Sequence, residues 1–512
     1  MLSRVLGLVR EQLIATLFSR TATDAFYVAF RIPNLLRDLF AEGAMSSAFV
    51  PTFTEYLKNH GRKEAWVLAS NILNILLLSL SGLTLLGILY SGRLVSLFAG
   101  EFKNTPGKFE LTVLLTQVMF PFLPMVALAA VLMGILNSHG TFFIPALAPA
   151  LFNIGSLVIA VVLYFWLPGW GYDAVLGMAI GTLCGGALQL LIQVPPLLKK
   201  GFAYSGSLNF KHPGVRRILF LMGPGTIGLA STQVNIFVNT WLATSQGEGP
   251  VSWLNYAFRL MQFPLGIFGV AIASAALPTV SAHAAAGELE GLRKTLTSAL
   301  RMVFVINIPA TFGLIFLSRP IIGLIYEHGK FKPTDTNSTS NALICYAIGL
   351  FAYSGIKVLV PAFYALGRSR IPVAISAICV AGNIAMNLWL IGPLGYLGLA
   401  LGTSLTAIGN FGLLFRQLQS VSGPLAMVQI FTLGLKMCIA SIAMGAVSMQ
   451  THRWLFPLGK PVSVGLEALV MALSIGLGLA TLYGACHLLR IEELVIATAA
   501  AKRKFSRLFP GA

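Results

Sequence analysis

Four charged side chains stand close together in an otherwise apolar stretch near the start of the chain. They are Arg31, Arg37, Asp38 and Glu42, all within residues 23–43. An arginine at the centre of a membrane-spanning helix costs about 2.5–3.5 kcal/mol on insertion scales, so a cluster of such charges indicates a function. We expect these side chains to face protein or a water-filled cavity and not acyl chains.

Helical phase separates these charges. At 100° per residue, a continuous helix places Arg31, Asp38 and Glu42 within about 20° of one face. Arg37 lies about 120° round the helix from that face. One hypothesis is an internal salt-bridge network. The other is a cavity in which arginine, whose planar fork stays protonated and suits phosphate, binds an anion while the carboxylates orient it. We assign the ligand-facing role to Arg37 and a structural role to Arg31.

The composition is that of a polytopic membrane protein. Of the 512 residues, 56% are hydrophobic and 10% charged, and the mean hydropathy is +0.81. Soluble domains carry about a quarter charged residues. Apolar runs of about 20 residues recur without barrel-like alternation, which predicts membrane-spanning helices. The net charge of +18 falls in short clusters between these runs, which indicates a positive-inside bias and argues against nucleic-acid binding.

We predict fourteen membrane-spanning helices, so both termini lie on one side. About 18 basic residues fall in the loops of one face, and about seven, Lys108 among them, in those of the other. This bias predicts cytoplasmic termini. The expected spans are residues 1–20, 25–52, 66–98, 111–137, 144–167, 172–198, 215–243, 251–279, 296–326, 340–365, 371–391, 396–419, 428–449 and 462–489.

The chain also repeats itself. Ala-Phe-Arg at 29–31 recurs at 257–259, and Ile-Pro at 144–145 recurs at 371–372, at offsets of 228 and 227 residues. This period covers six predicted helices, and an even number predicts parallel repeats, as in transporters whose substrate site lies between the halves. We expect an all-α protein with lobes at 1–200 and 201–420, two extra spans within 421–490 and a basic cytoplasmic tail at 491–512.

Further basic residues lie inside predicted spans. Arg10 is deep in the first span, which favours a cavity role, whereas Arg4 can equally snorkel to the membrane surface. Arg259 takes the place of Arg31 in the second repeat, seven residues after Ser252. These charges could converge on one anionic ligand. Lys357, alone in its span, either lines the cavity or pairs within the protein.

The sequence shows no phosphate-binding loop and no metal-binding cluster of histidines or cysteines, so we expect no enzyme activity, cofactor or metal. Transport would then depend on an ion gradient or the membrane potential. Two asparagine pairs at i,i+4, Asn235 with Asn239 and Asn383 with Asn387, either hydrogen-bond between helices or bind a small cation. No carboxylate lies beside them, which favours the hydrogen bonds.

Several motifs resemble the MurJ/MviN family of bacterial lipid II flippases. They are Ser-Arg-Val-Leu-Gly-Leu-Val-Arg at 3–10, Thr-Asp-Ala-Phe at 23–26, Arg-Ile-Pro-Asn-Leu-Leu-Arg at 31–37, Phe-Ala-Glu-Gly-Ala at 40–44 and Arg-Leu-Met at 259–261. The resemblance implies the multidrug/oligosaccharidyl-lipid/polysaccharide exporter fold, with two six-helix lobes around a cationic cavity that opens alternately to each side. It also implies the bacterial inner membrane as the location.

The resemblance further implies a substrate and site residues. The substrate is lipid II, an undecaprenyl diphosphate that carries a disaccharide-pentapeptide, and the last two spans would form a groove for its lipid tail within the membrane lipids. In that family, essential cavity charges match Arg4, Arg10, Arg37 and Arg259, and functional acids match Asp24 and Glu42. Asp38, Arg31, Ser252 and Lys357 are supporting candidates.

Three departures from the family pattern bear on these expectations. Relatives usually carry residues ahead of the first motif, so a truncated first span is one alternative for this sequence. Phe258 and Gln262 flank Arg259 where relatives often have acids, and sodium coupling cannot be carried over without a carboxylate beside the asparagines. The alternatives are an exporter of another polyprenyl-linked saccharide or amphiphile, and a non-transporting scaffold that recruits cell-wall synthesis proteins.

Overall fold

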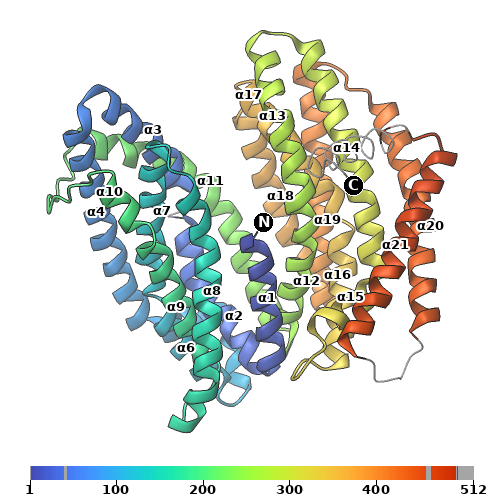
Figure 1. The fold of residues 1–512 in the computed structure, drawn as a ribbon, viewed down its shortest axis with the longest axis horizontal. Coiled ribbons are helices and arrows are strands. Elements are labelled where there is room, and N and C mark those ends of the chain that lie inside the picture. The colour runs from blue at the N-terminus through green and yellow to red at the C-terminus, as the bar shows by residue number, and fades with distance from the viewer. Residues whose placement is uncertain (1, 40–42, 457–462, 492, 494–512) are drawn as a thin grey trace, which may run out of the picture. The chain divides into compact units, whose positions relative to one another are not determined.

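The computed structural model describes residues 2–39, 43–456, 463–491 and 493, and in these ranges all regular elements are helices (Figure 1). The chain forms two compact units, residues 1–252 and 253–512. The predicted lobes divide at residue 200 instead. The helix α11 accounts for the difference, because it packs against α3 within the first unit.

The first unit is built around an apolar core that includes Phe53, Leu68 and Val131, all fully buried. Its helices are α1 (Leu2–Leu17), α2 (Arg20–Arg37), α3 (Gly43–Asn59), α4 (Gly61–Leu89), α5 (Ser91–Ala99), α6 (Lys108–Met119), α7 (Phe122–Ser138), α8 (Phe143–Trp166), α9 (Leu176–Leu191), α10 (Val194–Lys199) and α11 (Pro213–Thr244). The helix α12 (Pro250–Pro264) begins in this unit and continues into the second.

The second unit has its own core, which includes Leu300, Phe363 and Met437. After α12 the chain makes a π-helical turn at Leu265–Gly269. The helices that follow are α13 (Val270–Ala285), α14 (Leu289–Phe316), α15 (Ser318–Tyr326), α16 (Pro333–Ala347), α17 (Leu350–Ala365), α18 (Arg370–Leu394), α19 (Tyr396–Ser422), α20 (Met427–Leu455) and α21 (Val464–Leu488).

Glycines allow close helix packing in both units. A Cβ atom on Gly181 of α9 would lie 2.4 Å from the Ser156 carbonyl oxygen of α8. In the second unit, a Cβ atom on Gly398 of α19 would lie 2.5 Å from the Leu390 carbonyl oxygen of α18. Small residues at such seams let membrane helices approach closely. The two glycines lie in the repeated segments 176–182 and 397–403, so the repeat marks the same kind of seam in both units.

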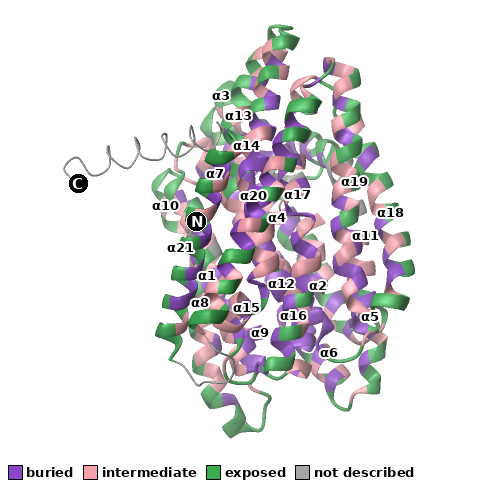
Figure 2. Cartoon of the chain, turned by 90° about the vertical axis from the view of Figure 1, so that its right-hand side faces the viewer, coloured by how far each residue is buried: buried purple, intermediate pink, exposed green. Residues whose placement is uncertain are grey.

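Large apolar side chains cover the outside of the helices. On α18, Ile378, Leu388 and Trp389 are all more than half exposed (Figure 2). Within the described residues, ten helices are long and apolar enough to cross a membrane, or eleven if the bent pair α16 and α17 is one span. Exposed apolar surface of this kind belongs in lipid, so the chain is a multi-pass membrane protein. The count of fourteen stays a prediction.

The predicted second span, residues 25–52, corresponds to α2, which ends at Arg37, and α3, which begins at Gly43. Asp38 and Leu39 continue from α2 in π-helical conformation, and residues 40–42 lie outside the described residues. The argument from helical phase applies to Arg31 and Arg37 within α2, and its extension to Glu42 stays a prediction.

Candidate anion-binding residues

Arg10 of α1 is buried beside a carboxylate. Its side chain donates from Nη2 to Glu11 Oε1 at 3.2 Å, and the residues are 7% and 0% exposed. The hydroxyl of Tyr27 on α2 donates to the other oxygen of Glu11. The guanidinium also lies 5.6 Å from the centre of the Phe152 ring. Among the described residues, Arg10 Nε has no hydrogen-bond partner although it is buried.

Arg37 pairs with the residue that follows it. At the end of α2, its Nε and Nη2 donate to Asp38 Oδ1 at 3.2 and 2.8 Å. Gln233 of α11 donates to the other oxygen of Asp38 at 3.4 Å. The Arg37 side chain is 21% exposed. This partial exposure leaves the guanidinium accessible to a ligand.

Asp24 has a different environment, because its carboxylate is fully buried and fully occupied. Lys108 Nζ lies 3.0 Å from Oδ2, which also accepts from the backbone N–H of Gly249 at 2.7 Å. Oδ1 accepts from the backbone N–H and the hydroxyl of Ser252 at 3.0 and 2.6 Å. Asp24 thus holds the residues where α12 begins, and a carboxylate with four donors has little capacity left for a substrate.

Lys108 corrects one expectation. The loop-charge argument counted it among the basic residues of the loops, whereas it is the first residue of α6, is 1% exposed and has its ammonium 4.0 Å from the centre of the Phe102 ring. It is paired with Asp24, 84 residues away in sequence. No local spacing rule connects residues so far apart, so sequence reasoning missed this pair.

The remaining candidates are less closely grouped. Arg31 is partly buried on α2, and Arg259 on α12 and Lys357 on α17 are exposed. Arg259 and Lys357 belong to the second unit, whereas Arg10 and Arg37 belong to the first. The side chain of Arg4 lies outside the described residues, as does Glu42. Residues that the prediction did not include are Glu11, Tyr27, Lys108 and Gln233. Of these four, only Glu11 could have been found from the sequence, because it is an acidic residue next to Arg10 in an apolar span.

One of the two asparagine pairs is hydrogen-bonded within the second unit. Asn383 donates to Thr406 Oγ1 at 3.1 Å, and Asn387 donates to Asn383 Oδ1 at 3.0 Å. Both asparagines are buried. The bond to Thr406 joins α18 to α19, and the bond between the two asparagines lies within α18. This arrangement favours the packing interpretation of the pair over a cation site.

Comparison with known proteins identifies the family. A family model described as lipid II flippase MurJ matches residues 13–464. The chain belongs to this family. The probable lipid II flippase MurJ of Vibrio cholerae is 36% identical over 97% of this chain and 96% of its own length. The lipid II flippase MurJ of Burkholderia cenocepacia is 37% identical over 81% of each chain.

Solved structures agree with this assignment. A structure of lipid II flippase MurJ in an inward closed conformation superimposes with a TM-score of 0.78 at 26% identity and covers 94% of this chain and 97% of its own. An inward-facing multidrug resistance transporter of the MOP superfamily shares the fold, with a TM-score of 0.70 at 15% identity over 84% of this chain and 95% of its own. The predicted MurJ family and its all-helical exporter fold are confirmed.

Proposed function

We propose that the protein moves lipid II from the cytoplasmic to the outer leaflet of the bacterial inner membrane by alternating access, with both termini in the cytoplasm. Membership of the MurJ family supports the substrate. The observation that carries the assignment of residues is the buried Arg10, whose Nε retains an unused donor. A buried donor without a partner costs about 1–3 kcal/mol, and a ligand that accepts this hydrogen bond recovers that energy.

The carboxylates beside the arginines allow the empty protein to keep these charges. A lone buried guanidinium would carry a desolvation cost of several kcal/mol, which Glu11 offsets for Arg10 and Asp38 for Arg37. A diphosphate brings a stronger negative charge and several acceptor oxygens. It can bind the Nε donor of Arg10 and the partly exposed guanidinium of Arg37 in charge-assisted hydrogen bonds. Arg4 and Arg259 would supply further positive charge, and Asp24 would act by positioning α12.

The lipid tail needs an apolar path, and the second unit offers one. A cavity of about 390 Å³ lies between α14, α17 and α20. Its walls are almost wholly apolar and include Phe304, Phe351 and Leu435, with Gly434 of α20 at one side. We assign this cavity to part of the isoprenoid tail, because α20 belongs to the two extra spans outside the repeat. The headgroup would then be held by arginines while the tail stays in an apolar environment.

The deciding experiment measures which leaflet holds lipid II in cells that depend on this chain. We expect Arg10→Ala and Arg37→Ala to leave lipid II on the cytoplasmic side and to cause lysis at normal protein levels. Arg93→Ala is the matched control, because Arg93 is exposed on the short helix α5 and stacks only against Tyr90. A normal distribution of lipid II between the leaflets in both the Arg10→Ala and the Arg37→Ala variant would contradict the proposed binding residues.

A further inference from the structure

The segment that connects α10 to α11, residues 200–212, contains no helix but is held against α4 by hydrogen bonds. Asn74 of α4 donates to the carbonyl oxygens of Ser205 and Ser207 at 3.1 and 2.8 Å. Its own carbonyl oxygen accepts from the Tyr204 hydroxyl at 2.7 Å. A single amide side chain therefore binds three residues of this segment, which we call the connector.

Asn71, one helical turn before Asn74, holds the next part of the connector. Its side-chain oxygen accepts from the Ser207 hydroxyl at 3.0 Å and from the Asn209 backbone N–H at 2.7 Å. The Ser205 backbone N–H donates to Ser70 Oγ at 3.0 Å. Asn71 is fully buried. The connector is thus fixed in register along α4.

From Tyr204 to Leu208 the connector alternates between exposed and partly buried residues, whereas Phe202 packs inward on the core of the unit. Ser205 and Ser207 face α4, whereas Tyr204, Leu208 and Phe210 are 64%, 48% and 53% exposed. This is an alternation of period two, but with the opposite sense to that of a strand on a water-soluble protein, whose apolar face is covered. An apolar face directed outward from a fixed segment needs an apolar environment outside it.

The surroundings of the connector indicate that this environment is lipid. Leu77 and Leu78, within one turn after Asn74 on α4, are 47% and 58% exposed, and Phe220 on α11 is 79% exposed. The apolar face of the connector thus continues the lipid-facing surface of the two helices beside it. Exposed lysines stand at its ends, namely Lys199, Lys200 and Lys211.

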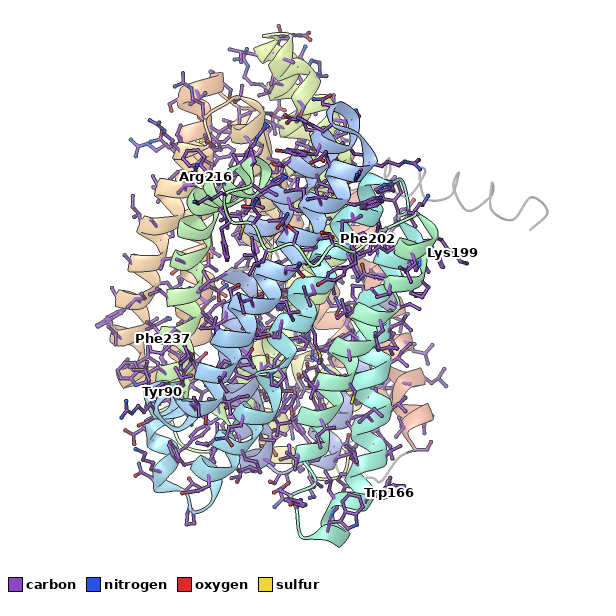
Figure 3. All side chains as sticks on the ribbon, turned by 90° about the vertical axis from the view of Figure 1, so that its left-hand side faces the viewer. Tyr90, Trp166, Lys199, Phe202, Arg216 and Phe237 are labelled. Atoms are coloured by element: carbon purple, nitrogen blue, oxygen red, sulfur yellow. The ribbon has the colours of Figure 1, made fainter. Side chains whose placement is uncertain are left out.

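A tryptophan and a lysine mark different levels of this unit. Figure 3 shows Trp166 at the lower end, and Lys199 with Phe202 well above it but below Arg216. The helix α8, which ends at Trp166, has 24 residues, or about 36 Å at 1.5 Å per residue, close to the thickness of a bilayer. Aromatic and lysine side chains concentrate at such membrane–water boundaries.

We propose that the connector is an interfacial anchor, which lies at the membrane–water boundary with Tyr204, Leu208 and Phe210 among the lipid headgroups and upper acyl chains. The lysines at its ends would reach the headgroup phosphates. The connector then acts as a fixed strap on the first unit and not as a flexible linker. The argument is independent of the transported substrate, so its failure would leave the flippase assignment untouched.

Spin labels on the full-length protein in lipid nanodiscs test this anchor. The five native cysteines are first replaced, and single cysteines are then introduced as Leu208→Cys, Phe210→Cys and the control Asn59→Cys. Asn59 lies at the exposed end of α3 in the same unit. We expect labels at 208 and 210 to collide more often with oxygen, which dissolves in lipid, and less often with an aqueous nickel chelate than the label at 59.

Two results would overturn the proposal. Equal collision rates with the chelate at all three positions would place the connector in water. Protection from both oxygen and chelate at 208 and 210 would mean that a protein covers this face.

A second variant tests the fixation. Asn74→Ala removes three hydrogen bonds, so the labels at 208 and 210 should become more mobile. Ser79→Ala on the same helix, whose hydroxyl bonds only within α4, should leave them unchanged. Unchanged mobility in both variants would contradict a strap held by Asn74.

Discussion

At the scale of single residues, the first unit uses its buried charges in two ways. Asp24 and Lys108 form a closed pair whose donors and acceptors are taken up inside the protein. Arg10 pairs with Glu11, and its buried Nε has no hydrogen-bond partner among the described residues. Arg37 pairs with Asp38 and stays partly exposed. Both kinds are charges in an apolar sequence, so composition alone does not separate a structural ion pair from a binding residue. The number of hydrogen bonds that each carboxylate already accepts separates the two.

Asp24→Asn should destabilise the protein strongly. The substitution leaves the Lys108 ammonium buried without its carboxylate, and breaking a buried pair in this way costs about 3–5 kcal/mol. We expect a marked fall in the Tm of the purified protein in detergent. Glu290→Gln is the control, because the Glu290–Lys294 pair is exposed on both sides and should not change the Tm. Equal Tm values for the two variants would argue against a structural role of the Asp24 pair.

At the residue scale we also expect a non-additive result for this ion pair. Lys108→Met alone leaves the Asp24 carboxylate buried with only neutral donors, whereas the double variant with Asp24→Leu removes both charges. Replacing a buried ion pair by apolar groups is often neutral. The double variant should therefore unfold at a higher temperature than either single variant, as a double-mutant cycle measured by thermal unfolding would show. Additive losses would mean that the charges do not interact.

At the scale of helices, the glycine seam between α8 and α9 should tolerate no added methyl group. Gly181→Ala would place a Cβ atom 2.4 Å from a backbone oxygen, which has little freedom to move. We expect a loss of about 1–3 kcal/mol, the usual cost of overpacking, measured as a lower Tm. Gly92→Ala on α5 is the control, because nothing lies within 4 Å of its added Cβ atom. A normal Tm for Gly181→Ala would show that the helices can separate without cost.

At the scale of the whole molecule, the distribution of basic residues predicts the orientation in the membrane. We expect Arg453→Cys, near the end of α20, to react with a membrane-impermeant maleimide added to intact cells. Lys294→Cys, near the start of α14, should react only after the cells are lysed. Labelling in the reverse pattern would contradict cytoplasmic termini and the positive-inside assignment.

Much of the fold was predictable because lipid imposes a simple rule on composition. Long apolar runs must be helices. The segments repeated at 176–182 and 397–403 each contain a glycine at a helix seam, a contact that the repeat alone does not predict. Arg10 and Arg37 were singled out as candidates because they are charges in apolar segments. The Asp24–Lys108 pair depends on tertiary contacts that no period in the sequence encodes.

The glycine seams also have a mechanical consequence. Where two helices touch through their backbones, neither can bend without the other. We therefore expect α8 with α9, and α18 with α19, to move as rigid pairs. In the path from α12 to α13 a π-helical turn follows Pro264 directly, whereas Pro149 of α8 and Pro393 of α18 lie within continuous α-helix. A π turn is a usual place where a helix bends. A conformational change in the second unit would therefore bend the chain at residues 264–269, while the helix pairs joined by glycine seams keep their shape.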